Sequence, residues 1–365
     1  MSSLLLAAKN LKVERGGLNV LSIPDFSIQE GEVLAVIGPN GAGKTTFLLA
    51  LSSLLKPSQG ELIFKGQNIC LAEAAFSYRR SLAMVFQEPL LLDTSVFNNV
   101  AAGLKIRRMG KREIEKRVTK YADVVGISHL LDRSARKLSG GEAQRANLAR
   151  AFAIEPEIIF LDEPFVNLDA PSRDSLTDDL QRILQQMGTT AIIATHDRLE
   201  ALRLADRLAV MNCGRIIQIG ACNEVTNHPV DEITASFVGM ETIFSGYVQK
   251  VHDGSFTVSV SGRDIEALGL VEAGEKVVCC IRPEQIIISD HKIGEGTSIR
   301  NNLPGKIVKI VSQGHFFKIH LDCGFFLASY VTQQSLDNLS LREEKPVTVS
   351  FKATAVHVIR RERRL

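Results

Sequence analysis

A glycine-rich loop that carries one lysine is the part of the sequence best suited to chemistry. Residues 38–46 read GPNGAGKTT and fit the pattern G-x-x-x-x-G-K-[ST]. In this pattern, backbone N–H groups curl round a phosphate, Lys44 supplies positive charge to the β- and γ-phosphates, and the Thr45 hydroxyl can ligate Mg²⁺. The loop predicts a site for a nucleotide with Mg²⁺, made by Gly38, Asn40, Gly41, Gly43, Lys44, Thr45 and Thr46.

Two adjacent carboxylates form the second candidate for chemistry. Asp162 and Glu163 follow the apolar run in EIIFLDEP, residues 157–164. We expect Asp162 to hold Mg²⁺ and Glu163 to polarise the attacking water. The alternative is a pair of solvated charges at a strand end. The phosphate loop upstream favours the catalytic interpretation.

The elements that must position these groups are short buried strands. Residues 31–55 predict a strand, the glycine-rich loop and then a helix, while 157–164 and 189–197 predict central parallel strands with polar groups at their carboxyl ends. Residues 170–188 predict a helix with Gly188 just past its end, and the charged, helix-periodic stretch within 88–137 predicts a helical insertion.

A third stretch identifies a family. Residues 138–151, LSGGEAQRANLARA, place Ser139, Gly140 and Gly141 at a predicted helix N-terminus, which is a favourable position for an anion. Together with the loop and the carboxylate pair, this stretch resembles the ATP-binding subunits of ABC transporters. In that family it faces the γ-phosphate of ATP held by the other subunit. The resemblance therefore implies a homodimer that sandwiches two ATP molecules.

The resemblance assigns further roles, residue by residue. Gln87 in MVFQEP looks like the glutamine that touches the metal and the attacking water, Asp169 in NLD like an interface aspartate, and His196 in ATHD like the histidine that contacts the γ-phosphate. Arg15 departs from the family, which usually has an aromatic residue there to stack on adenine. Its guanidinium can stack on a flat base or point to solvent.

Composition and charge exclude several other classes of protein. The 365 residues suggest two or three domains, and the net charge of +2 argues against broad nucleic-acid binding. The six cysteines are scattered without metal-ligand spacing, which is typical of reduced cytosolic thiols. No apolar run is long enough to span a bilayer. The basic C-terminal RRERRL is either a solvated tail or a phosphate-binding patch, and the former is favoured.

The pattern of apolar and polar residues changes near residue 238. Short alternating runs separated by Gly and Asp predict a small β-barrel or sandwich, and 245–290 and 297–360 could be two related β units, although their sequence similarity is too weak to establish a repeat. CIRPEQI, residues 280–286, resembles the regulatory β domain found in importers of sugar, iron, polyamine, sulfate and oxyanions.

Two polar runs in the last β unit suggest a cargo. TSIRNNLPGKI, residues 297–307 after a turn at Gly294 and Gly296, and FKATAVHV, residues 351–358, resemble the molybdate/tungstate-binding β domain. Short donors and cations suit a tetrahedral dianion. The alternative is that they are turn and edge residues in solvent. The positions that match the family pattern are Ser298, Arg300, Asn301, Lys352 and Thr354; Ile299 departs from its usual alanine.

The sequence thus predicts two domains. The first, over 1–238, is an α/β P-loop nucleotide-binding domain with its helical insertion at 88–137. The second, over 239–365, is an all-β, barrel-like regulatory domain whose oxyanion-type unit spans about 297–360.

The function expected is an Mg²⁺-dependent ATPase subunit of a molybdate/tungstate importer, peripheral to the cytoplasmic face of the membrane. Its expected partners are a second copy, a membrane permease and, indirectly, a periplasmic or extracellular solute-binding protein, with no nucleic acid. The alternatives are the same ATPase serving sulfate, iron, sugar or polyamine, and a cytosolic oxyanion sensor or store with a vestigial ATPase.

Overall fold

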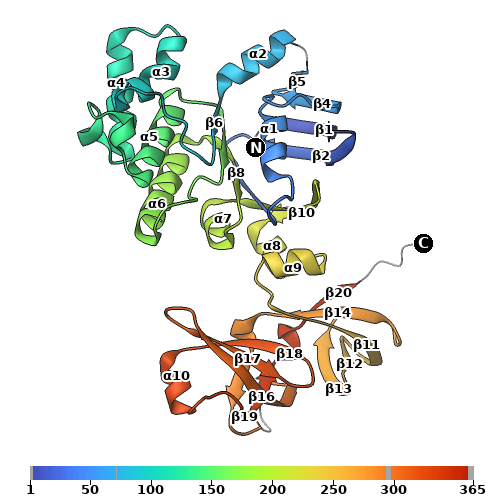
Figure 1. The fold of residues 1–365 in the computed structure, drawn as a ribbon. Helices are drawn as coiled ribbons and strands as arrows, with labels where there is room; N and C mark the ends of the chain where they lie inside the picture. The colour runs from blue at the N-terminus through green and yellow to red at the C-terminus, as the bar shows by residue number, and fades with distance from the viewer. Residues whose placement is uncertain (1–2, 71, 293–296, 361–365) are drawn as a thin grey trace. The chain divides into compact units, whose positions relative to one another are not determined.

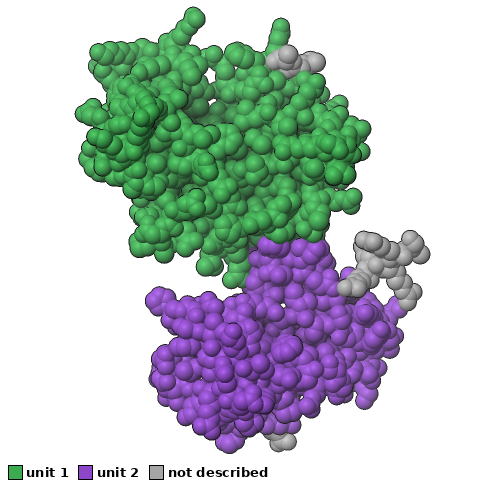
Figure 2. Space-filling view, viewed as in Figure 1, with its two compact units in different colours: residues 1–222 green, residues 223–365 purple. Residues whose placement is uncertain are grey.

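The computed structural model describes residues 3–70, 72–292 and 297–360. The chain divides into two compact units, Met1–Cys222 and Asn223–Leu365, which are coloured separately in Figure 2. The predicted turn at Gly294 and Gly296 and the basic run 361–365 lie outside the described residues.

Unit 1 is built on a six-stranded sheet with the order β10-β9-β3-β8-β7-β6. Strands β3, β6, β7, β8 and β9 pair in parallel, and β10 adds an antiparallel edge. Every residue of β3, β7 and β8 is buried, which explains why the sequence there is continuously apolar. The bounds are β3 Val33–Ile37, β6 Leu82–Val85, β7 Ile158–Asp162, β8 Thr190–Thr195, β9 Arg207–Asn212 and β10 Arg215–Ala221.

One hydrophobic core of unit 1 joins this sheet to a four-stranded antiparallel sheet, β2-β1-β4-β5. Phe47 and Leu48 of helix α1 are buried in this core and fix the helix that follows the glycine-rich loop. The bounds are β1 Leu4–Arg15, β2 Leu18–Gln29, β4 Gln59–Phe64, β5 Gln67–Asn68, α1 Lys44–Leu51 and α2 Ala72–Ser81.

A second core of unit 1 lies among the helices, which form a layer labelled α3 to α6 in Figure 1. The predicted insertion at 88–137 forms α3 and α4 with two short 3₁₀ turns, and α5 packs against both helices. The bounds are α3 Val96–Ile106, α4 Lys111–Val124, η1 Ser128–Leu130, η2 Ala135–Lys137, α5 Gly140–Ala153, α6 Ala170–Met187 and α7 Arg198–Leu204. Among the described residues, no helix combines the length and apolar character needed to cross a bilayer.

Unit 2 contains two five-stranded sheets around one shared core. Their orders are β13-β12-β11-β14-β20 and β15-β19-β16-β17-β18. The first sheet contains β11 Thr242–His252, β12 Ser255–Val260, β13 Arg263–Leu268, β14 Lys276–Ile281 and β20 His357–Arg360. The second contains β15 Ile287–Ser289, β16 Asn301–Ser312, β17 Phe317–Asp322, β18 Phe326–Val331 and β19 Pro346–Phe351, with helix α10 at Gln333–Asn338.

The two halves of unit 2 exchange their last strands. In the first half, β14 is followed by the 3₁₀ turn η3, Pro283–Gln285, and then by β15, which pairs with β19 of the second half. In the second half, β19 is followed by η4, Ala353–Ala355, and then by β20, which pairs with β14 of the first half. The halves are therefore structural counterparts, although their sequences are too dissimilar to establish a repeat.

Two buried polar residues hold equivalent places in these halves. Thr242 begins β11 and pairs with Ile281, and its hydroxyl accepts a hydrogen bond from Ala328 N at 3.0 Å. Asn301 begins β16 and pairs with Phe351, and its side-chain amide hydrogen-bonds to the backbone of Glu266 in β13. Each side chain thus ties the start of one half to the third strand of the other.

Helices α8, Cys222–Asn227, and α9, Glu232–Phe237, extend unit 2 towards the N-terminus. Ala235 and Met240 pack with Val278, Cys280 and Ile359 in a small core. This core is part of the β unit, so α8 and α9 belong with the strands. The compact units therefore divide after Cys222, before the boundary at 238 that the residue pattern predicted.

Replacing Asn301 with alanine should destabilise unit 2. The side-chain amide, 3% exposed, accepts from Glu266 N at 2.8 Å and donates to Glu266 O at 2.9 Å. Its loss leaves two backbone groups of β13 without these partners, so we expect the free energy of unfolding to fall by about 1–3 kcal/mol in denaturant titration. Ser298→Ala, in the exposed run just before β16, is the control and should change stability by less than ~0.5 kcal/mol. Equal stability of Asn301→Ala and the wild type would contradict the bridging role.

Candidate nucleotide-hydrolysis site

The glycine-rich loop connects buried β3 to α1 through backbone conformations that favour glycine. Gly43, at the N-cap of α1, has φ 98°, and Gly41 has φ 81°. A Cβ added at Gly38 would lie 2.2 Å from Met211 O, so this position tolerates no side chain. The positive end of α1 therefore opens into a tight loop, as phosphate binding requires.

Lys44 is buried with its ammonium group inside the loop, where it is 6% exposed. Its Nζ donates to Gly38 O at 2.9 Å and lies 3.6 Å from Glu163 Oε1. A buried cation needs such partners because desolvation is costly. Phosphate oxygens that reached Nζ would compete with Glu163 for this charge.

Asp162 and Thr45 form a donor set that fits a divalent cation. The Asp162 carboxylate is 3% exposed, its Oδ1 has no hydrogen-bond partner, and the Thr45 hydroxyl bonds to the carboxylate. Burial raises the pKa of Asp162, and the charge of Glu163 adds to this effect, whereas Thr45 and Lys44 oppose it. A hard cation prefers such oxygen ligands and would favour the ionised carboxylate.

Glu163 is held in a strained conformation beside His196. Its φ of 48° is uncommon for a non-glycine residue, and its N–H donates to Ala194 O at 2.9 Å in β8. Its Oε2 lies 2.6 Å from His196 Nδ1, so the protonated Nδ1 tautomer donates to the carboxylate.

Asp197 caps α7 by accepting a hydrogen bond from Leu199 N at 2.7 Å and so fixes the chain just after His196. The sequence interpretation missed this role, although an aspartate before a helical run is an N-cap signal.

Lys44, Thr45 and Glu163 line one cavity of about 360 Å³, whereas Gly38, Asp162 and His196 are not among its lining residues. Arg15, at the end of β1, and Gln87, just after β6, line it together with the loop. The sequence interpretation also missed Val20, an apolar residue with no chemical signature. The cavity brings together predicted residues from separate segments: Arg15, Asn40, Gly41, Gly43, Lys44, Thr45, Thr46, Gln87 and Glu163.

The stretch at Ser139 borders a different cavity, of about 420 Å³. Ser139 caps α5 in a capping box with Glu142, and in the first turn Gly140 is exposed and Gly141 is half-buried. Asp169 lines the same cavity, and a hydrogen bond from Ser172 lowers the pKa of its carboxyl. Within the described chain, the two cavities share no lining residue.

The predicted oxyanion residues occupy different environments in unit 2. Ser298, Arg300 and Lys352 are exposed, and Thr354 lies in η4. The run before β16 and the run after β19 leave the same end of a strand pair, because Asn301 pairs with Phe351. Asn301 itself is buried and bound to the Glu266 backbone, so its amide has a structural role there.

Comparisons with known proteins agree with this geometry. A family model described as ABC transporter matches residues 21–166, and one described as TOBE domain matches 297–358. A molybdate/tungstate import ATP-binding protein of Pyrococcus abyssi is 36% identical, covering 91% of this chain and 94% of its own. A spermidine/putrescine import ATP-binding protein of Trichodesmium erythraeum is 37% identical over 77% of this chain and 75% of its own. A sulfate/thiosulfate import ATP-binding protein of Methylococcus capsulatus is 35% identical over 86% and 87%.

Solved structures resemble unit 1. An ABC-transporter subunit from Clostridium perfringens aligns with a TM-score of 0.58 and 32% identity, covering 61% of this chain and 90% of that chain. A dimeric ATP-binding cassette bound to ADP and phosphate aligns with a TM-score of 0.55 and 26% identity, covering 60% of this chain and 99% of that chain. The predicted α/β fold followed by an all-β unit is confirmed.

The chain belongs to the ATP-binding subunits of ABC importers. Members of this family bind ATP, dimerise, associate with the membrane through a permease and are ATPases coupled to transport. The predicted family and enzyme class are therefore confirmed. The role of each site residue stays a prediction that the geometry makes testable.

Glu163→Gln should abolish ATP hydrolysis while leaving ATP binding nearly intact. The change keeps the size of the side chain but removes the carboxylate that would orient and polarise water, so we expect a loss of about 10²–10⁴-fold in turnover. Phosphate release and nucleotide titration measure the two properties. Glu157→Gln is the matched control, since Glu157 is exposed and paired with Lys65. Normal turnover in Glu163→Gln would refute the base assignment.

Arg15→Ala should weaken ATP binding. If the guanidinium stacks on the base, its removal should cost about 1 kcal/mol, or roughly fivefold in the dissociation constant. Lys9→Ala, an exposed change on the same strand, should have no effect. An unchanged dissociation constant in Arg15→Ala would exclude Arg15 from the adenine contact.

Proposed function

We propose that this chain is the ATP-hydrolysing subunit of a molybdate/tungstate importer, with unit 2 as a sensor of the imported oxyanion. The observation that carries the cargo proposal is the pairing of Asn301 with Phe351, since it brings Ser298 and Arg300 to the same strand end as Lys352. Hydroxyl, guanidinium and ammonium donors gathered there suit a tetrahedral dianion. The relatives named for molybdate/tungstate import support the same cargo.

The motor step follows from the nucleotide cavity. ATP bound through Lys44 in one copy presents its γ-phosphate to Ser139 of a second, head-to-tail copy, and the dimer closes. Glu163, oriented by His196, takes the proton of the attacking water. Mg²⁺ held by Thr45, Gln87 and Asp162 would offset charge on the phosphate oxygens. Hydrolysis removes the bridging phosphate, and the dimer reopens.

The surface that would contact the permease lies beside Gln87. The contact would be made on the cytoplasmic side of the membrane. Leu90 and Leu92, which follow Gln87 towards α3, are 61% and 53% exposed. Exposed apolar side chains next to the nucleotide cavity suit docking of a cytosolic permease loop. Movement of Gln87 on ATP binding would be transmitted to that loop. A solute-binding protein outside the membrane would deliver the cargo.

The sensor proposal gives the oxyanion a regulatory effect. An oxyanion held at Ser298 and Lys352 would keep the two nucleotide-binding units of the dimer apart and so resist further uptake. The same motor serving another cargo is the main alternative, because sulfate and polyamine import relatives have similar identity. A sensor or store with a vestigial ATPase is disfavoured by the assembled groups Lys44, Asp162 and Glu163.

Calorimetric titration of molybdate, tungstate and sulfate into the full-length protein tests the cargo. We expect molybdate and tungstate to bind and sulfate to bind much more weakly. The double change Ser298→Ala with Lys352→Ala should weaken molybdate by about 10²-fold, as expected for two lost charge-assisted contacts. Lys306→Ala, a cation exposed elsewhere on β16, is the control.

Transport by the complex with its permease completes the test. Saturating oxyanion should slow uptake and ATP hydrolysis in the wild type but not in the double variant. Absence of molybdate and tungstate binding would overturn the sensor and return sulfate and the other cargos to consideration. The ATPase assignment would stand.

A further inference from the structure

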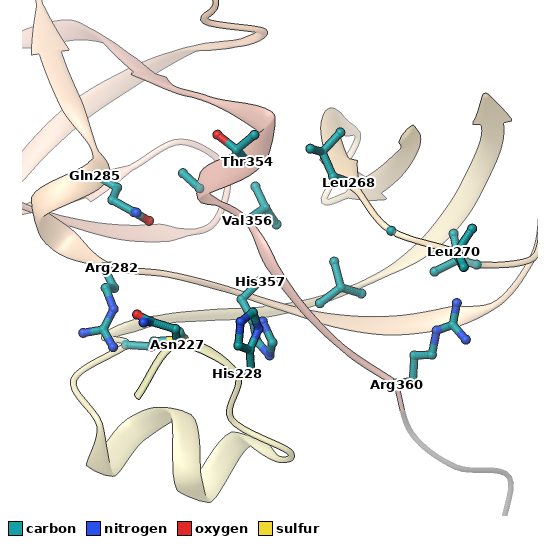
Figure 3. A pocket seen from close by; sticks show the side chains of 15 residues that line it. Asn227, His228, Leu268, Leu270, Arg282, Gln285, Thr354, Val356, His357 and Arg360 are labelled. Carbon is teal, nitrogen blue, oxygen red and sulfur yellow. The ribbon is translucent and has the colours of Figure 1, made fainter. Parts of the chain in front are cut away.

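A cavity of about 750 Å³ in unit 2 has no part in the proposed motor. Figure 3 shows its wall formed by segments distant in sequence: the end of α8, the connection after β13, the turn η3, and the stretch from η4 into β20. Its volume is in the range of pockets that hold small organic ligands.

Basic and neutral polar groups line one part of the cavity. Arg282, His228, His357 and Arg360 belong to it, and none of the described lining residues is acidic. The carboxylate of Glu284 lies 3.8 Å from Arg282 Nη1, but its side chain is 53% exposed. The local charge therefore favours an anion.

Two imidazoles lie side by side at the same part of the cavity. The rings of His228 and His357 lie 5.8 Å apart between centroids, and His357 Nε2 donates to Pro229 O at 2.9 Å. Burial, with a smaller contribution from His228, lowers the pKa of His357, so this imidazole is a neutral hydrogen-bonding group and adds no positive charge. Arg282 is held in place by hydrogen bonds to Val238 O at 3.1 Å and Thr226 O at 2.5 Å.

Apolar side chains line the remainder of the cavity. Leu268 and Leu270 are 43% and 82% exposed, and Val271 and Val356 join them. The two halves of unit 2 differ in the connection that could cover this surface. After β18, the connection 332–345 contains α10, whose Leu336 packs against the core. The counterpart connection after β13, residues 269–275, is short and contains no helix.

We propose that this cavity binds a small organic anion with a compact, negatively charged head and an apolar body. The head lies among His228, Arg282 and Arg360, and the body lies against Leu268 and Leu270. The cavity shares Thr354 and residues 355–358 with the second oxyanion run, but Ser298, Arg300 and Lys352 do not line it. It does not depend on the proposed cargo.

Two fluorescent probes of the same skeleton test this site in the full-length protein with saturating ADP. Anilinonaphthalene sulfonate carries a charged head, whereas N-phenyl-1-naphthylamine lacks it. We expect saturable sulfonate binding that His228→Gln with Arg360→Gln weakens about tenfold, while the uncharged probe changes less than about twofold. Leu270→Glu should weaken both probes. These variants leave the structurally bonded Arg282 in place.

Matched controls separate the site from general surface binding. Val308→Glu and His315→Gln introduce similar changes elsewhere in unit 2 and should leave both affinities unchanged. Displacement by phenyl phosphate and by benzoate then distinguishes a phosphate head from a carboxylate head. Three outcomes would each overturn the proposal: unchanged sulfonate affinity in the double variant, equal weakening of the two probes, or displacement of the sulfonate by molybdate.

Discussion

The buried ammonium of Lys44 is the constraint on which the ATPase unit depends. A cation at 6% exposure requires compensation, and it receives it from Gly38 O and Glu163. These partners come from the ends of β3 and β7, which β8 separates in the sheet. The parallel register of the three strands therefore brings the loop and the carboxylate together. In the proposed mechanism, ATP phosphates would supply the negative charge that Lys44 needs, and nucleotide binding would thereby release Glu163 from its ion pair with Lys44.

The site departs from ordinary local rules in ways that serve this chemistry. Asp162 has a buried oxygen without a partner, and Glu163 has a positive φ. Both features cost stability in isolation and persist because fully buried strands hold the backbone around them. Ser139, by contrast, sits in a well-capped helix end. In the proposed dimer, a strained and charged site on one copy would meet a well-capped helix end, which carries Glu142, on the other.

Much of unit 1 was predictable because its signals are local. A glycine-rich loop between an apolar run and a helix has few structural solutions, and the strands 157–164 and 189–197 were buried as expected. Other features depend on contacts that spacing does not encode. The strand exchange of unit 2 was not predicted, since a period-two pattern fixes which face is buried but not which strand is the neighbour. Asn301 matched an oxyanion motif, but its amide is bound by the Glu266 backbone. The sequence alone does not distinguish a buried polar side chain that hydrogen-bonds to the backbone of a neighbouring strand from one that faces a ligand.

The two halves of unit 2 have the same strand arrangement but expose different residues. Thr242 and Asn301 fix the same junction, and η3 and η4 turn the chain at the same point. The residue before each turn is basic, Arg282 in one half and Lys352 in the other. Arg282 is bound to two carbonyl oxygens, whereas Lys352 is exposed. Helix α10 accompanies one half and a short connection the other. The shared core sets the position of each turn, so side chains there can diverge in function with little cost to the fold.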